Sequence, residues 1–182
     1  MKRKIALISE HASPLAALGG VDSGGQNVYV GELARHLGQL GYEVDVFTRW
    51  DDARLPPVVE WTSNVRVVHV KAGPVAFVRK EDLLPHMREF TDNVLAYARE
   101  QDYPYRLIHA NFWMSALVAA EIKQLIGTPF VVTFHALGAV RLQHQGTADE
   151  FPAERIAIER RVVQEADHII AECTQDREDL LT

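Results

Sequence analysis

Short apolar segments alternate with longer amphipathic segments along this chain, and this alternation limits the folds open to it. Continuous apolar runs such as Ile5-Ala6-Leu7-Ile8 are typical of strands that are covered on both faces. The pattern predicts strands at 5–8, 42–48, 65–70, 107–109, 130–134 and 168–171. Helical spacing of apolar residues predicts helices at 27–40, 81–100, 114–126 and 152–166. Strands and helices in this order imply an α/β fold, with a mostly parallel sheet and helices on both of its faces.

The length of the chain, 182 residues, fits one domain, and its 47% of hydrophobic residues is enough to build a core. The segment 49–64 contains Pro56-Pro57 and is predicted to be a surface connection. A polar loop of about fifteen residues is predicted before the helix at 152–166. The chain stops within the first turns of a further helix that starts near residue 174. We therefore expect one domain of a longer polypeptide.

Charge and residue usage exclude several classes of function. Acidic residues outnumber basic ones by 25 to 19, and no run of Lys and Arg forms the dense basic face that nucleic-acid binding needs. The one cysteine excludes a disulfide framework, and the eight histidines lack metal-ligand spacing, so no metal site is expected. No apolar stretch approaches the ~20 residues of a transmembrane segment, and no signal peptide follows the basic start. A cytoplasmic location is expected.

A glycine-rich loop follows the first predicted strand and leads into the first helix. Gly24 and Gly25 let a ligand approach the backbone, and amides at a helix N-terminus, here near Gln26 and Asn27, attract anions. The spacing fits neither the dinucleotide motif nor the phosphate loop with its lysine. Ser23 and Gln26 also have the spacing of a capping box, which would close the helix start without any ligand. Both interpretations are compatible, since Gly24 and Gly25 would still expose their amides.

Three polar side chains follow the ends of predicted strands. Gln26 comes after the first strand and its loop, Asn111 after the fourth strand and His135 after the fifth. Ligands of open parallel sheets bind beyond the carboxyl ends of the strands. These three residues are therefore predicted to meet at one edge of the sheet. A lone histidine is more often structural than functional, so His135 gains its weight from this convergence.

Basic residues near these loops are candidates for binding a phosphate group. Lys80 precedes the helix at 81–100, Arg141 lies in the loop that follows His135, and Arg155 lies near the start of the next helix. Arginine binds phosphate through paired donors, and lysine through a mobile point charge. Taken alone, each of these residues can equally be a solvated surface charge.

These residues together resemble a known family. The segment from Gly24 to Arg35, Gly-Gly-Gln-Asn-Val-Tyr-Val-Gly-Glu-Leu-Ala-Arg, resembles the acceptor-side signature of retaining GT-B glycosyltransferases of family four. Within that family it is most similar to sucrose-phosphate synthase, sucrose synthase and the mycothiol-pathway enzymes. The segment from Thr133 to Gly138, Thr-Phe-His-Ala-Leu-Gly, resembles the family's His-Ser-Leu-Gly or His-Thr-Leu motif. Segments 79–83, 111–113 and 165–171 also match in order and spacing, so the resemblance covers essentially the whole chain.

The resemblance implies an enzyme with two Rossmann-like domains that face a cleft. Residues 1–182 would be a single Rossmann-like acceptor-binding domain, the N-terminal half of a GT-B fold. The C-terminal domain that binds the nucleotide-sugar would be absent from this chain, which would then be inactive alone. The complete enzyme would transfer a hexose from a nucleotide-sugar, a UDP-sugar above all, to a sugar or sugar-phosphate acceptor with retention of configuration. The nucleotide-sugar would be a substrate, and no cofactor would be tightly bound.

The resemblance also implies roles for individual residues. Gly25 and Gln26 would approach the donor phosphates and the acceptor, and His135 would be the catalytic residue that contacts the donor sugar near the reacting carbon. Lys80 and Arg155 align with residues that hold an acceptor phosphate. The predicted substrate-binding residues are Gly24, Gly25, Gln26, Asn27, Lys80, Asn111, Arg141 and Arg155.

The sequence departs from the family at two of its acceptor positions. Phe112 stands where the mycothiol-pathway enzymes have a tyrosine, and Ala136 stands where they have a hydroxyl residue. Each change removes a potential hydrogen bond to an acceptor phosphate, typically ~1.5–3 kcal/mol when the partner is charged. A sugar phosphate and an unphosphorylated sugar therefore both stay open as acceptors.

Two other functions are compatible with this architecture. A nucleotide-sugar epimerase shares the two-domain plan, but it needs acid and base carboxylates in the cleft, for which Glu10 and Asp22 are the candidates. A stand-alone domain that binds a sugar phosphate without catalysis is the second alternative. It would require the natural protein to end at Thr182.

Overall fold

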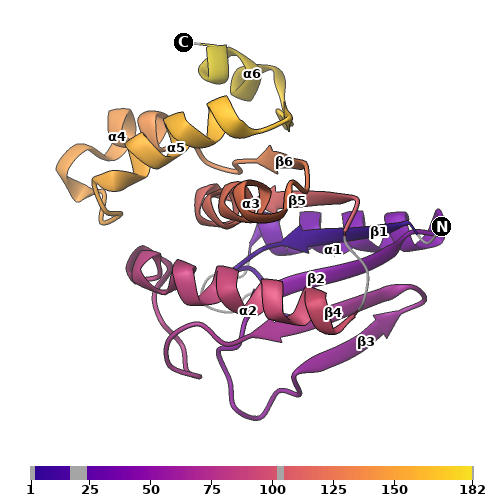
Figure 1. The fold of residues 1–182 in the computed structure, drawn as a ribbon. Helices are drawn as coiled ribbons and strands as arrows, with labels where there is room; N and C mark the ends of the chain where they lie inside the picture. The colour runs from indigo at the N-terminus through magenta and orange to yellow at the C-terminus, as the bar shows by residue number, and fades with distance from the viewer. Residues whose placement is uncertain (1–2, 17–23, 102–104, 182) are drawn as a thin grey trace.

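A computed structural model describes residues 3–16, 24–101 and 105–181 (Figure 1). Within these residues the strands form a seven-stranded sheet in the order β3-β4-β2-β1-β5-β6-β7. Its strands are β1 (Lys4–Ile8), β2 (Glu43–Arg49), β3 (Val58–Thr62), β4 (Val65–Val70), β5 (Leu107–Asn111), β6 (Phe130–Thr133) and β7 (His168–Ile169). Every neighbouring pair is parallel except β3 and β4, which are antiparallel. The predicted α/β fold with a mostly parallel sheet is confirmed.

Helices cover both faces of the sheet, as predicted. They are α1 (Gly25–Gln39), α2 (Met87–Glu100), α3 (Trp113–Ile126), α4 (Gly138–Gln145), α5 (Glu154–Glu165) and α6 (Thr174–Leu181). Short 3-10 turns lie at Lys80–Asp82, Leu84–His86 and Gly146–Ala148. In Figure 1, α2 and α3 lie on one side of the sheet and α1 on the other, while α4 and α5 lie beyond β6.

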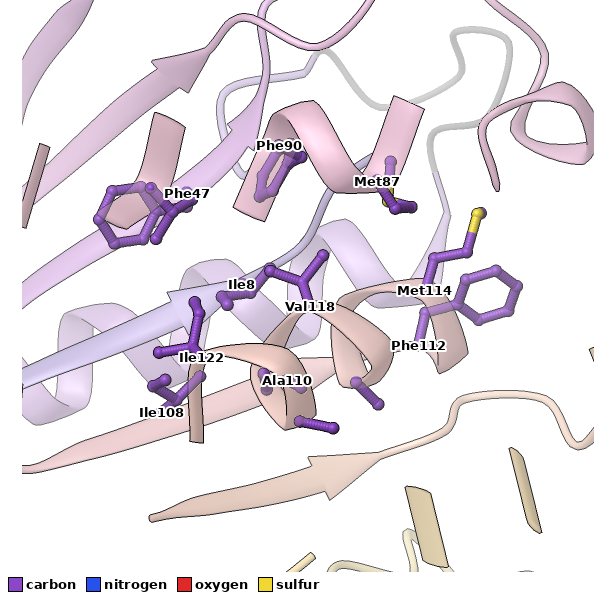
Figure 2. Packing of buried hydrophobic residues seen from close by; sticks show 14 of the residues in the cluster. Ile8, Phe47, Met87, Phe90, Ile108, Ala110, Phe112, Met114, Val118 and Ile122 are labelled. Carbon is purple, nitrogen blue, oxygen red and sulfur yellow. The ribbon is translucent and has the colours of Figure 1, made fainter. Parts of the chain in front are cut away.

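The core is divided between the two faces because alternate side chains of a strand point in opposite directions. Ile5 and Leu7 of β1 pack with Val30 and Ala34 of α1. Ile8, the next residue along β1, belongs to the larger cluster under α2 and α3, which Figure 2 shows together with Phe47, Phe90, Met114, Val118 and Ile122. Both faces of β1 are thus buried, which explains its continuous apolar run.

The order of the strands fixes where a ligand can bind. From β1 the chain extends to one side through β2 and β4, and later to the other side through β5, β6 and β7. The strand order therefore reverses between β1 and β5. In this architecture ligands usually bind in the crevice at such a reversal, beyond the carboxyl ends of the strands.

Two elements were not predicted from the sequence. The segment 49–64, predicted to be a surface connection, contains β3. This edge strand is half exposed, so it lacks a continuous apolar run, and the prolines lie before it rather than in it. The polar loop predicted before the helix at 152–166 contains α4, of which only Gly138 is buried, so no apolar stripe marked it.

The helix predicted at 81–100 begins later than expected. Two 3-10 turns occupy its first part, and α2 starts at Met87. Pro85 lies at the start of the second turn. Proline lacks a backbone N–H and its ring clashes with the preceding turn of a helix, which favours a helix start after it. Lys80 is consequently held at the head of a 3-10 turn rather than before a long helix.

Candidate functional site

A pocket of about 950 Å³ opens beyond the carboxyl ends of β1, β5 and β6. The loop after β1 and the first turns of α1 contribute His11, Gly24, Gly25, Gln26, Asn27 and Tyr29. Later segments contribute Lys80, Phe112, His135, Ala136, Arg141 and Glu172. The turn at Gly24–Gln26 thus faces the same pocket as His135, at the predicted edge of the sheet. The two are more than a hundred residues apart in sequence.

Asn27 closes the start of α1. The Asn27 side chain accepts a hydrogen bond from Gly24 N at 2.9 Å and donates one to the Ser13 carbonyl at 2.8 Å. The capping box predicted from Ser23 and Gln26 involves Ser23, which lies outside the described residues. Among the described residues, no atom lies within 4 Å of a Cβ atom built on Gly24 or Gly25. These glycines therefore leave open space beside their backbone on the pocket side of the helix.

The Gln26 side chain links the end of β1 to the end of β5 through hydrogen bonds. Its Nε2 donates to Ser9 Oγ at 3.1 Å and to the Asn111 carbonyl at 3.2 Å. Asn111 is fully buried and donates through Nδ2 to the carbonyl oxygens of Ile8 and His109. Asn111 does not line the pocket, so the structure places this predicted binding residue behind the pocket wall.

His135 is held at the pocket by residues from three elements. Its Nε2 lies 3.2 Å from Asn111 Oδ1, its Nδ1 lies 3.1 Å from the Glu172 carboxylate, and the Tyr29 ring packs against it edge-on at 4.9 Å. The backbone of His135 has φ 59°, in the left-handed region that few residues other than glycine adopt. Burial lowers the pKa of His135, although the Glu172 carboxylate opposes the change. Both of its neighbours are acceptors, and a neutral imidazole carries a single N–H, so a neutral ring can donate to only one of them at a time.

A second histidine lies beneath the first. His109 on β5 is 5% exposed, and its Nε2 lies 2.9 Å from Thr133 Oγ1. Burial lowers the pKa of His109 to about 4, and repulsion from His135 adds to the effect. Tyr29 Oη is 3.4 Å from the same Thr133 hydroxyl. This buried polar layer supports the pocket floor from below.

The three predicted basic residues have different positions. Lys80 and Arg141 line the pocket, and Arg141 Nε pairs with Asp149 at 3.0 Å. Arg155 does not line it, because its side chain is 2% exposed and pairs with Glu159 at 2.7 Å. The guanidinium of Arg155 lies under the pocket wall, 5.1 Å from the centre of the Phe112 ring.

Arg155 and Glu159 together hold the loop that carries His135. Arg155 Nη2 donates to the Ala136 carbonyl at 2.6 Å, and Gly138 N donates to Glu159 Oε2 at 2.9 Å. A Cβ atom on Gly138 would lie 2.9 Å from Arg155 Nε and 3.0 Å from Glu159 Oε2, so glycine is needed where the backbone approaches this pair. The ion pair on α5 thus fixes both ends of the turn between β6 and α4.

Arg49 likewise holds the backbone of the segment that leads to Lys80. This arginine at the end of β2 is 4% exposed. Its guanidinium donates to the carbonyl oxygens of Pro74 at 2.7 Å and Ala72 at 3.4 Å, and also to that of Ala76. These carbonyl groups would otherwise be unpaired in a loop, and their shared donor gives the loop one shape.

Among the aromatic and titratable side chains of the pocket, four were missed from the sequence: His11, Tyr29, Phe151 and Glu172. His11 and Glu172 follow the ends of β1 and β7, so the rule that singled out Asn111 and His135 could have found them. Tyr29 lies three positions after Gln26, which puts both on one face of α1. Phe151 belongs to a loop and carried no signal.

The pocket combines aromatic walls, uncharged hydrogen-bonding groups and exposed backbone amides. Phe112, Phe151 and Tyr29 offer faces and edges on which a sugar ring can pack, and the His135 ring lies against Tyr29. Amides at the start of α1 suit an anionic group such as a phosphate. Among the described residues, no three His, Cys, Asp or Glu side chains are grouped so as to hold a metal ion. Nor is any helix in the described part of the chain long and apolar enough to cross a bilayer.

Comparisons with known proteins agree with this chemistry. The chain is 39% identical over its whole length to D-inositol 3-phosphate glycosyltransferase 2 of Catenulispora acidiphila, of which it covers 43%. It is 40% identical, over 98% of its length, to D-inositol 3-phosphate glycosyltransferase of Kineococcus radiotolerans, of which it covers 42%. The chain therefore spans less than half the length of these curated relatives.

A solved structure extends the agreement to the fold. Sucrose-phosphate synthase from Thermosynechococcus elongatus superposes with a TM-score of 0.93 at 33% identity, over 99% of this chain and 45% of that one. A family model described as a glycosyl transferase 4-like domain matches residues 24–182. The chain therefore belongs to the glycosyl transferase 4-like domain family.

Proposed function

We propose that this chain is the acceptor-binding domain of a retaining hexosyltransferase, which moves a hexose from a nucleotide-sugar, a UDP-sugar above all, to a hydroxyl group of a sugar or sugar phosphate. The observation that carries the proposal is the shared pocket, which the Gly24–Gln26 turn and His135 enter from different strand ends. The names of the relatives support the reaction class, because two are glycosyltransferases named for D-inositol 3-phosphate and the third is a sucrose-phosphate synthase.

The proposed transfer takes place on one face of the donor sugar. The acceptor oxygen forms its bond to the anomeric carbon while the bond from that carbon to the diphosphate breaks, and the hydroxyl proton passes to the departing diphosphate oxygen. No protein nucleophile is needed. The task left to the protein is to align the two substrates and to stabilise the charge of the leaving group.

Three parts of the pocket would share this task. Amides of Gly25 and Gln26 would lie against the departing diphosphate, where a helix N-terminus favours negative charge, while the Gly24 amide already donates to Asn27. His135 would contact the donor sugar and so orient its reacting carbon. Lys80 and Arg141 would bind the acceptor, with Arg141 already balanced by Asp149. A second domain that binds the nucleotide would close over this face.

The test is transfer by the complete encoded protein. UDP-, ADP- and GDP-sugars are each incubated with fructose 6-phosphate, fructose or inositol phosphate, and products are followed by mass spectrometry and by the proton coupling at the new anomeric centre. The proposal predicts transfer with retained configuration from one donor. Isomerisation of the nucleotide-sugar without an acceptor would favour the epimerase. Binding of a sugar phosphate without any turnover would favour a non-catalytic module.

A further inference from the structure

Glu10 has a position that the proposed reaction leaves unexplained. It follows β1, its side chain is 0% exposed, and no described lysine or arginine pairs with it. A buried carboxylate without a cationic partner is costly unless hydrogen bonds satisfy its oxygens. In this structure two side chains do so, one for each oxygen. His11 Nδ1 lies 2.9 Å from Glu10 Oε1, and the Ser115 hydroxyl on α3 donates to Glu10 Oε2.

The Ser115 hydroxyl fixes the position of this carboxylate. Besides donating to Oε2, Ser115 Oγ accepts a hydrogen bond from Glu10 N at 3.3 Å, so backbone and side chain of Glu10 are held by one residue. Ser115 is itself fully buried in the first turn of α3. The Glu10 carboxylate is thus anchored to the same helix that packs beneath the pocket.

An anchored carboxylate decides which nitrogen of His11 carries the proton. An ionised carboxylate can only accept hydrogen bonds, so the nitrogen beside it, Nδ1, must be the donor. In a neutral imidazole the other nitrogen then has a free lone pair. His11 lines the pocket, its ring is braced edge-on by Phe112 at 4.9 Å, and Nε2 has no partner among the described residues. Nε2 is therefore the atom left to meet a ligand.

We infer that Glu10 is a positioning residue, which holds His11 in the Nδ1-protonated form so that Nε2 accepts a hydrogen bond from a hydroxyl group of the bound sugar. The inference rests on the proposed function for the identity of the ligand, but the form of the ring does not depend on it. It also gives Glu10 a role other than that of an acid or base in an epimerase, since the carboxylate faces His11 and Ser115 rather than the pocket.

The first test measures the ring itself. Proton–nitrogen correlation spectra of the 182-residue chain, labelled with ¹⁵N, distinguish protonated from unprotonated ring nitrogens, and His11→Gln assigns the His11 signals. Wild-type His11 is expected to carry its proton on Nδ1 alone. His36 is the internal reference, because its Nδ1 lies 2.7 Å from the Glu32 carbonyl, which can only accept. A proton on Nε2 of His11, alone or together with one on Nδ1, would overturn the inference.

A variant then tests whether Glu10 is the cause. Glu10→Met keeps the length of the side chain and removes both acceptors, so the His11 proton is expected to move to Nε2, as in most free histidines, while His36 stays unchanged. Ser115→Ala retains the carboxylate and is the second variant, in which a mixture of the two forms is expected. If Glu10→Met folds and His11 still carries its proton on Nδ1, the assignment is contradicted. If Glu10→Met does not fold, a His11 proton that stays on Nδ1 in Ser115→Ala contradicts it instead.

The second test uses transfer by the complete encoded protein. Glu10→Met is expected to lower kcat/KM for the acceptor about tenfold, the value of one neutral hydrogen bond, without changing the donor KM. In a His11→Gln background the same substitution is expected to change kcat/KM less than twofold, because Glu10 acts through His11. Equal losses in both backgrounds would show a structural role only. Absence of transfer by the wild type would reject the proposed function and leave the ring measurement to decide on Glu10.

Discussion

At the scale of single residues, His109 is the histidine that most directly links stability to pH. Its pKa is about 4 in the folded chain against 6.5 for an ordinary histidine, because burial penalises the charged ring. Above pH 6.5 the ring is neutral in both the folded and the unfolded state, and stability is at its full value. As the pH falls from 6.5 to 4, only the unfolded state gains a proton, so stability is lost.

The predicted loss from His109 is about 3 kcal/mol between pH 6.5 and pH 4, since each unit of pKa corresponds to about 1.4 kcal/mol. Denaturant unfolding at a series of pH values measures it. His109→Gln is expected to show a flatter profile over this range, whereas His36→Gln, at an exposed position on α1, should match the wild type. Parallel profiles for the wild type and His109→Gln would contradict the buried, neutral state of this ring.

His135 is the residue whose loss should affect catalysis most. We expect His135→Ala in the complete encoded protein to lower kcat by about 100-fold, because misplacement of a reacting group by about 1 Å typically has an effect of that size. The same assay on His36→Ala gives the matched control, since His36 is remote from the pocket. Turnover within threefold of the wild type in His135→Ala would remove His135 from the proposed reaction.

At the scale of elements, the Arg155–Glu159 pair on α5 sets the shape of the turn between β6 and α4. We expect Arg155→Met to lower the free energy of unfolding by about 3–5 kcal/mol, because it leaves Glu159 buried without its charged partner. The double variant with Glu159→Met should recover part of that loss, since it removes the unpaired charge as well. Thermal and denaturant unfolding of the 182-residue chain, without any ligand, measures both effects.

The same variants separate two roles for Arg155. Its alignment with a phosphate-holding residue predicts a loss of acceptor binding with little change in stability. The structure instead gives Arg155 contacts to Glu159 and the Ala136 carbonyl, which predict the loss of stability in the free chain. Wild-type stability in Arg155→Met would show that these contacts are dispensable.

The elements that the sequence predicted well are those that are buried on both sides. The runs in β1, β4 and β6 and the helical spacing in α1 and α3 result from contacts on two faces, so the pattern survives without knowledge of the fold. The helix α4 buries only its first residue, and β3 is an edge strand, so neither carries a strong period. The turn Lys80–Asp82 follows a loop that Arg49 holds through tertiary hydrogen bonds, and no local sequence pattern predicts it.

At the scale of the whole molecule, the sequence predicted which residues lie at this edge of the sheet but not how deeply each of them is buried there. Gly24, Gly25, Lys80 and His135 reach the pocket, because loops after parallel strands converge there. Asn111 and Arg155 lie one layer lower, as packing partners of the residues that do line it. The order of strands and helices along the chain indicates which loops reach this edge of the sheet. How deeply each residue is buried there depends on how α3 and α5 pack against the strand ends.

The most direct test of the central claim, that this pocket binds the acceptor, is amide chemical-shift mapping of the 182-residue chain with fructose 6-phosphate, fructose and inositol phosphate as probes. We predict that one probe shifts the amides of Gly24, Gly25, Tyr29 and His135 in a saturable way. A smaller pocket of about 290 Å³, lined by Arg3, Tyr42 and Arg106, lies near the opposite ends of the strands and serves as the comparison. Shifts confined to that pocket, or no saturable shift at Gly24 and His135 with any probe, would contradict the account.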